Sequence, residues 1–215
     1  MFEPWVGEKY SHESGFAGGR LLILGESHYS KRVEEIGETP EKFTENVVRY
    51  FGIERRHNFF GKVQEVVTGV PRKQQTAADK KVFWNAVAFY NWVPTIVDGR
   101  PVSEGGARRR PTDDMFRAGG APFQVIRRRL EPRAVIVCGL TLWDHVAPTL
   151  DSFGHADRDV IFYDDGNCMY ARISHPSTPR FDTRKWCRRV GHLLELSAQP
   201  RQLGRKIRWQ EWDKV

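Results

Sequence analysis

Short apolar runs alternate along the chain with segments whose apolar residues recur at helical spacing. The apolar runs predict buried strands at 20–25 (RLLILG), 85–90 (NAVAFY) and 132–139 (PRAVIVCG). The runs RDVIFYDD and CMYARIS predict two further strands, and the DDGN sequence between them predicts a hairpin.

Helical spacing predicts five helices among these strands, at 38–53, 59–70, 112–130, 140–150 and 183–196. Thr39 is the expected N-cap of the first, followed by Pro40 at its first helical position. Strands that alternate with helices predict a mostly parallel sheet covered on both faces. We therefore expect one three-layer α/β/α domain at residues 1–198, with a central sheet of about four to five strands. A basic, tryptophan-containing extension would follow at 199–215.

The composition narrows the class of protein. The chain has 215 residues, of which 40% are hydrophobic and 28% charged, as in a globular domain with a sizeable core. No apolar run approaches the roughly 20 residues of a membrane span, and the polar start does not read as a signal peptide, so we expect a cytoplasmic protein. Three distant cysteines predict neither a disulfide framework nor a cysteine metal site, and Cys138 should be a core residue. We expect a monomer without a cofactor.

The charge of the chain points to its partner. The net charge is +7, with a pI of about 9.5. The cations gather in four clusters, at 108–110, at 127–129, at 184–189 and at 201–208. Trp186, Trp209 and Trp212 lie close by in the sequence. Clustered cations with aromatic neighbours favour a polyanion, and DNA is the partner we expect. A solvated cationic surface is the alternative.

Loops at the ends of the expected strands are the places to look for chemistry, because ligands of open α/β sheets gather beyond the carboxyl ends of the strands. These loops read GESHY, NWVP, GLTLW and SHPSTPRF. In the first, Glu26 and Ser27 compete for the role of reacting group.

One interpretation makes Ser27 a nucleophile. LGES, with His175 and Pro176 far downstream, resembles the GDSL-type ester hydrolases, which pair a strand-end serine with a histidine in a D-x-x-H-P pattern. A carboxylate must orient the histidine that activates such a serine. Arg172 stands where that carboxylate would be, which weakens this interpretation.

The other interpretation makes Glu26 the reacting group. The chain over about 20–195 resembles the uracil-DNA glycosylase superfamily, whose thermophilic branch has a G-E-A-P-G motif where this chain has GESHY. The segments NFFG, WNAV, NWVP, RRPTDD, PRAVIVCGLT and HPS follow in the family's order, resembling its P-F-V-G, T-N-V-V and later motifs. Each motif alone is weak, whereas the ordered set is more specific.

The resemblance implies a role for each matching residue. Glu26 would stabilise the oxocarbenium-like sugar and activate water, while His175 would donate to the leaving base. Asn85 would bind the pairing edge of a flipped base, and Phe59 would stack on it. The first motif would complete the binding site with Ser27, His28 and Tyr29. The last loop would enter the duplex through Ser177, Arg180 and Phe181, and further DNA contacts would come from Arg109, Arg110 and Arg184.

Ordinary structural roles remain open for these residues. Glu26 could sit at a helix start, His175 could be a hydrogen-bonded loop residue, and Asn85 could cap a backbone. Phe59 and Phe60 are at core spacing, and His28 could be a surface residue.

Some positions depart from the family. The iron–sulfur cysteines of the thermophilic branch are missing, so no cluster is implied. Tyr29 resembles the tyrosine of the G-Q-D-P-Y branch, yet that branch's catalytic Asp falls on Ser27. The segment 31–57 is longer than usual. We therefore expect a monofunctional DNA glycosylase acting on uracil or another base, such as thymine, hypoxanthine or a modified cytosine, in repair or in defence against modified phage DNA. A catalytically inactive nucleic-acid-binding module is the alternative.

Overall fold

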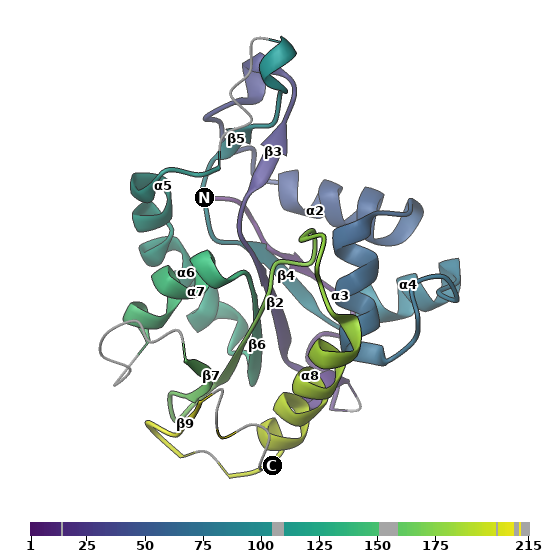
Figure 1. The fold of residues 1–215 in the computed structure, drawn as a ribbon, viewed down its shortest axis with the longest axis vertical. Coiled ribbons are helices and arrows are strands. Elements are labelled where there is room, and N and C mark those ends of the chain that lie inside the picture. Colours follow the sequence, from purple (N-terminus) through teal and green to yellow (C-terminus); the bar gives the residue numbers. More distant parts are fainter. Residues whose placement is uncertain (14, 105–109, 151–158, 201, 209–210, 212–215) are drawn as a thin grey trace.

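The protein has an α/β fold built on a mostly parallel sheet with helices packed around it (Figure 1). The computed structural model describes residues 1–13, 15–104, 110–150, 159–200, 202–208 and 211. In this part of the chain the main sheet has seven strands in the order β1-β4-β2-β6-β8-β7-β9. They are β1 (Trp5–Val6), β2 (Leu21–Gly25), β4 (Ala88–Asn91), β6 (Ala134–Cys138), β7 (Val160–Asp164), β8 (Met169–Ile173) and β9 (Lys206–Arg208).

The middle of the sheet is parallel and its edges are antiparallel. Strands β4, β2, β6 and β8 run in one direction, while β1, β7 and β9 each pair antiparallel with their neighbours. The carboxyl ends of the four parallel strands therefore lie at the same end of the sheet. Beyond this end, a two-stranded parallel sheet of β3 (His28–Ser30) and β5 (Ile96–Asp98) projects from the body, at the top of Figure 1.

Helices pack around the main sheet. The bounds are α1 (Phe16–Gly19), α2 (Phe43–Val47), α3 (Asn58–Thr68), α4 (Ala77–Asn85), α5 (Asp113–Ala118), α6 (Gly120–Leu130), α7 (Leu140–Val146) and α8 (Thr183–Ser197). A π-helical segment, η2 (Val48–Glu54), continues α2, and single 3-10 turns occupy η1 (Val33–Glu35), η3 (Val102–Glu104) and η4 (Ala147–Thr149).

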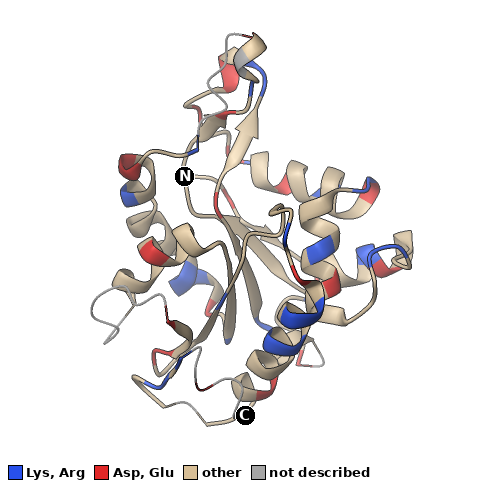
Figure 2. Ribbon diagram, viewed as in Figure 1, with Lys and Arg blue, Asp and Glu red and all other residues tan. Residues whose placement is uncertain are grey.

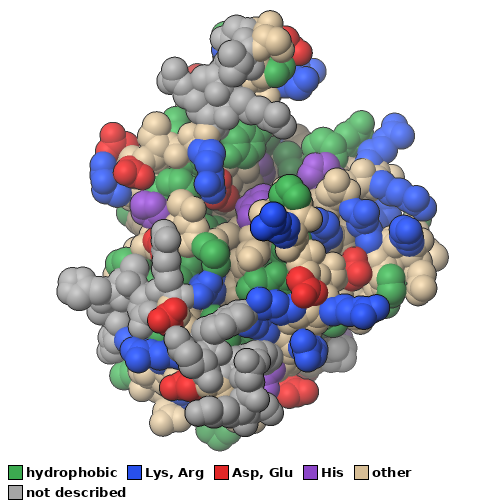
Figure 3. Space-filling model, viewed as in Figure 1, with side chains coloured by type: hydrophobic (Ala, Val, Ile, Leu, Met, Phe, Trp, Pro, Cys, Tyr) green, Lys and Arg blue, Asp and Glu red, His purple; other side chains and the backbone are tan. Residues whose placement is uncertain are grey.

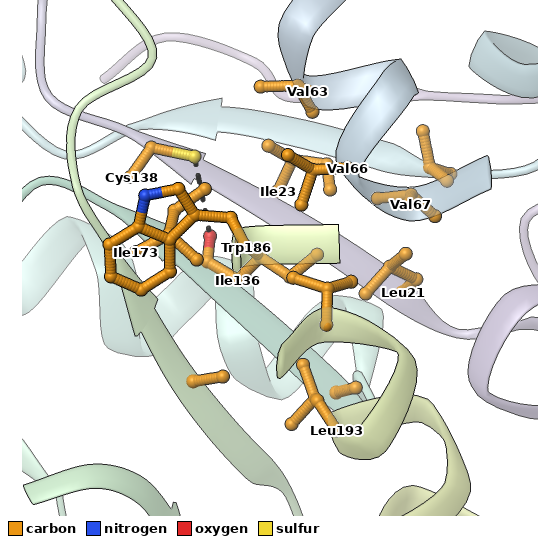
Figure 4. Packing of buried hydrophobic residues seen from close by; sticks show 14 of the residues in the cluster. Leu21, Ile23, Val63, Val66, Val67, Ile136, Cys138, Ile173, Trp186 and Leu193 are labelled. Atoms are coloured by element: carbon orange, nitrogen blue, oxygen red, sulfur yellow. Dashed lines mark hydrogen bonds between the residues drawn. The ribbon is translucent and has the colours of Figure 1, made fainter. Parts of the chain in front are cut away.

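Alternation along the strands divides the core into two parts. Leu21 and Ile23 of β2 pack with side chains of α3 and α8, whereas Leu22 and Leu24 pack with those of α6 and α7. Successive side chains of a strand point to opposite faces, so a strand buried on both faces needs a continuous apolar run. Figure 4 shows the first part, where the fully buried Cys138 is a core residue as expected.

The structure confirms several elements predicted from the sequence. Strands β7 and β8 form the expected hairpin. Helix α3 ends where Gly69 adopts a φ of 73°, a left-handed conformation that suits glycine. The last helix begins after Asp182, whose carboxylate accepts a hydrogen bond from the Lys185 N–H.

Other expected elements differ. The first helix begins at Phe43 instead of near Thr39, because the Thr39 hydroxyl donates to the Pro94 carbonyl and does not cap a helix. The helix expected at 112–130 is broken at Gly119, which lies against Trp92. The strand expected at 85–90 is wrong at its start, since Asn85 ends α4 and the strand begins at Ala88.

The sheet is also wider than the four to five strands expected. Strands β1 and β9 have two and three residues, too few to leave a periodic signal in the sequence. Because β9 pairs with β7 and buries Ile207, residue 198 does not end the fold. Among the described residues, no helix combines the length and the apolar character needed to cross a membrane.

Candidate active site

A cavity of about 380 Å³ opens at the edge where the parallel strands end; we call it the strand-end cavity. Its polar lining comes from the ends of β2, β4 and β8, from β3 and from the residue before α3, and comprises Glu26, Ser27, His28, Tyr29, His57, Asn91, His175 and Ser177. Its apolar lining is largely aromatic, from Phe51, Phe59, Phe60 and Phe89. Figure 3 shows histidine and hydrophobic side chains gathered in the hollow below the β3–β5 projection. A mostly apolar cavity with a few convergent polar groups is typical of a small-molecule or base site.

Glu26 is a buried carboxylate at this edge. It directly follows β2, and its side chain is only 7% exposed. Burial raises the pKa of Glu26, and the Arg110 guanidinium opposes this rise, with its Nη2 atom 3.5 Å from Oε2. A carboxylate with a raised pKa and a nearby cation can be ionised at neutral pH and still accept a proton.

His175 follows β8 on the other side of the cavity. Its Nδ1 atom accepts a hydrogen bond of 3.2 Å from the Ser177 backbone N–H, so the proton of the neutral ring is on Nε2. Burial, aided by the charges of Arg110 and Lys62, lowers the pKa of His175 to about 4. At neutral pH the ring is therefore an uncharged hydrogen-bond donor.

Gly139 keeps open the space between these two side chains. It follows β6, and a β-carbon placed on it would stand 3.8 Å from Glu26 Oε2 and 3.9 Å from His175 Cδ2. Its φ of 143° is a conformation that other residues rarely adopt. Glu26 and His175 thus approach the same point from strands β2 and β8, on either side of β6.

Asn91 presents a side-chain amide at the end of β4. The residue is 4% exposed, and its Nδ2 atom donates to His28 Nδ1 over 3.0 Å. The other ring nitrogen of His28 donates to the Thr44 hydroxyl over 2.8 Å. Burial lowers the pKa of His28 to about 3, so this ring stays neutral and the chain of bonds has a fixed direction. Gly25 allows the close approach, because a β-carbon there would collide with Asn91 Oδ1.

Asn85, expected to bind the base, does not line the strand-end cavity. It ends α4 and lines a different cavity, with Trp5, Glu45 and Lys81 among its neighbours. The strand that follows it is parallel to β2, and its carboxyl end, paired with Gly25, carries Asn91. The sequence offered one signal for Asn91, since NWVP was selected as a strand-end loop and Asn91 is its first residue.

Other expected base-site residues do line the strand-end cavity. Phe59 is buried in its wall with its ring centroid 5.4 Å from that of His175. Tyr29 is about half exposed at the rim, and its pKa is raised, chiefly by burial. Ser27 and His28 line the cavity as well, and the expectation missed Phe51.

The last loop is only partly as expected. Phe181, expected to enter the duplex, is 9% exposed and packs in the core beside Trp186, with ring centroids 6.3 Å apart. Arg180 and Arg184 are exposed on the surface next to it, and Ser177 lines the cavity. Arg110 lies against Glu26 and Thr141. Arg109 lies outside the described residues.

The serine-hydrolase arrangement is not formed. The Ser27 hydroxyl makes no hydrogen bond with His175, whose Nδ1 is engaged by the backbone of Ser177. Arg172, in the place of the orienting carboxylate, donates from Nε to the Val160 carbonyl. In the part of the chain that the structure describes, no group of three or more His, Cys, Asp or Glu residues could hold a metal ion.

Comparison with models of known protein families gives no match to this chain, and comparison with curated proteins finds no significant relative. What can be said of function therefore rests on the geometry of the site and on the motifs of the sequence.

Proposed function

We propose that the protein is a monofunctional DNA glycosylase that hydrolyses the N-glycosidic bond of uracil or of a modified pyrimidine. The observation that carries this proposal is the pair of Glu26 and His175. A buried carboxylate and a neutral, oriented imidazole face the same aromatic cavity from the carboxyl ends of two parallel strands. Glycosidic cleavage needs these two kinds of group on opposite sides of the breaking bond.

The chemistry follows from the two protonation states. As the bond between C1′ of the sugar and the base nitrogen breaks, its electron pair goes to the base and positive charge develops on the sugar. The Glu26 carboxylate stabilises that charge and takes a proton from the water whose oxygen bonds to C1′. The Nε2–H of His175 donates to the oxygen on which the base gathers negative charge. A neutral imidazole suits this role, because its N–H donates without releasing its proton.

The remaining lining fits a flipped base. Phe59 offers an aromatic surface for stacking. The Asn91 amide, held by His28, offers a second N–H and a carbonyl to the pairing edge. In this proposal Asn91 has the role first expected of Asn85. The size of the cavity, at the low end of small-molecule sites, favours a single base.

The fold is compatible with this function. We propose that the mostly parallel sheet and the helices on its two faces form the three-layer α/β/α arrangement of the uracil-DNA glycosylase superfamily. The order of the motifs and their places at strand ends support this assignment.

The test is release of free base. The protein is incubated with a panel of DNA substrates that contain uracil, thymine mismatches, hypoxanthine or modified phage cytosines, and mass spectrometry identifies any base set free. We expect one panel member to react, and Glu26→Gln to lower the rate by about 10²–10⁴-fold. Glu131→Gln is the matched control, because this exposed residue pairs with Arg20 at the far end of the sheet. Release of no base, or full activity in Glu26→Gln, contradicts the proposal.

A further inference from the structure

A second cavity lies beside the first and is lined by cations; we call it the basic cavity. It has a volume of about 320 Å³ and is bounded by η2, the first turns of α3 and the segment that leads to α4. Five of its lining residues are basic and none is acidic, and the basic ones are Arg55, Arg56, Arg72, Lys73 and Lys80. Figure 2 shows Lys and Arg along this side of the molecule, on α3, α4 and α8.

These cations have no carboxylate partner within the described part of the chain. The guanidinium of Arg72 donates to the Asn58 side-chain oxygen, and Lys80 Nζ donates to the Arg55 carbonyl over 3.2 Å. Both acceptors are uncharged. Five like charges around one concave site repel one another, and a bound polyanion would relieve that repulsion.

The cavity has a fixed wall. Gln75 is 8% exposed, and its Nε2 atom donates to the carbonyls of Gly61 and Val70 over 3.0 and 3.1 Å. The stem of Arg72 lies directly on Gly61, where a β-carbon would stand 2.8 Å from Arg72 Cδ. The segment that carries Arg72 and Lys73 is thereby held against α3.

The basic cavity adjoins the strand-end cavity through two aromatic side chains. Phe51 and His57 line both cavities, and their ring centroids are 4.8 Å apart. Tyr50 contacts Phe51 at 4.9 Å, and the Arg55 guanidinium lies 5.7 Å from the centroid of the Tyr50 ring. Exposed rings between clustered cations are the composition of a surface for single-stranded nucleic acid, on which bases stack while cations follow the phosphates.

We propose that the basic cavity binds the phosphodiester backbone of the strand whose base occupies the strand-end cavity. Phe51 and His57 then lie against the neighbouring base of the same strand. This inference rests on the proposed function in so far as the strand-end cavity is taken as the base site. It adds that the protein grips a single strand beside the reacting nucleotide, through the segment 48–80.

The test is the salt dependence of binding. Arg56→Gln with Lys73→Gln is introduced into the full chain, in a Glu26→Gln background so that binding is separated from reaction. Neither Arg56 nor Lys73 forms a side-chain bond in the described structure whose loss would disturb the fold. Fluorescence anisotropy then measures the affinity for a labelled single-stranded oligonucleotide over a range of salt concentrations. The matched control is Lys9→Gln with Arg20→Gln in the same background; both residues lie outside the basic cavity and outside the four cation clusters of the sequence.

Two lost phosphate contacts should lower the slope of log affinity against log salt by about 1.4, since each contact with a single strand contributes about 0.7. At physiological salt this corresponds to roughly tenfold weaker binding. The control variant should keep the slope of the parent. An unchanged slope in Arg56→Gln/Lys73→Gln, or an equal loss in the control, overturns the inference.

Failure of this inference can be told apart from failure of the proposed function. If the wild-type protein releases a base and the salt slope of Arg56→Gln/Lys73→Gln is unchanged, only the proposed role of the basic cavity is wrong. If the slope is lowered but no substrate releases a base, the basic cavity is a nucleic-acid site and the proposed glycosylase function is wrong. Inorganic phosphate is also compared with an unlabelled oligonucleotide as a competitor, at equal phosphate concentration. If the two compete equally well, the cavity binds a free anion and the inference is overturned.

Discussion

Arg110 lies against the carboxylate that we place at the centre of the reaction, and it also acts on the histidine across the cavity. Its guanidinium lowers the pKa of Glu26 and lowers the pKa of His175. Activity in the proposed mechanism needs an ionised Glu26 and a neutral His175. Arg110→Gln moves both groups the wrong way at acidic pH, because each then holds its proton to a higher pH.

The size of the effect follows from the geometry. The Arg110 side chain is 71% exposed and its Nη2 atom is 3.5 Å from Glu26 Oε2. Water screens such a pair, which limits the interaction to about 0.2–1 kcal/mol. Removing 1 kcal/mol lowers the ionised fraction of Glu26 at acidic pH by up to about fivefold, with no effect on the plateau at higher pH.

The assay is single-turnover base release with excess protein, measured from about pH 4 to pH 8. We expect the acidic limb of the Arg110→Gln profile to lie at higher pH than that of the wild type. Arg20→Gln, remote from the cavity and outside the cation clusters, should leave the profile unchanged. A uniform loss of rate at every pH would mean that Arg110 serves only DNA binding. That result, or a limb displaced to lower pH, would refute the electrostatic role.

Three further predictions concern the same site. Gly139→Ala should destabilise the protein by about 1–3 kcal/mol, because alanine is strained at the φ of 143° that Gly139 adopts. A thermal melt should show this as a Tm lower by several degrees. Gly191→Ala, in an open position of α8, should leave Tm unchanged. The free energy of unfolding should fall as the pH is lowered from about 6.5 toward about 3, because His28 binds a proton in the unfolded state that the folded state excludes. In urea unfolding, the midpoint of His28→Gln should therefore depend less on pH in this window than that of the wild type. An equal dependence would contradict the assignment. Borohydride should trap no covalent adduct between the protein and DNA. Lys62, whose Nζ donates to the Pro176 carbonyl, does not line the strand-end cavity. A trapped adduct that disappears in Lys62→Ala would mean that the Lys62 amine, and not water, is the nucleophile.

The motifs at strand ends were accessible from the sequence. Leu21–Gly25 and Ala134–Cys138 are continuous apolar runs, and such runs form strands that are buried on both faces. The residues that follow parallel strands then meet at one edge whatever the details of the fold. For this reason the sequence places Glu26 and His175 at one end of the sheet, whereas Phe59, on helix α3, was assigned to the site only by the family resemblance.

The sequence could not show which of two asparagines lies in the strand-end cavity. An asparagine stands at each end of the run that contains β4, and both Asn85 and Asn91 have the chemistry to bind a base. The helix α4 extends over the first, because Thr76 and Asp79 form a capping box that starts it and no breaker ends it earlier. Phe181 shows the same limit, since its place in a loop said nothing of the hollow beside Trp186 that it fills.

The sequence by itself determined which segments are buried and which polar groups follow them, because both depend on the order of residues within a few positions. Only the tertiary structure decided which of those groups share a cavity. Arg110 and Glu26 are 84 residues apart, and the basic cavity joins η2 to a segment beyond α3. Contacts at such separations depend on the order of the strands and on the packing of helices over them, and no local pattern records these.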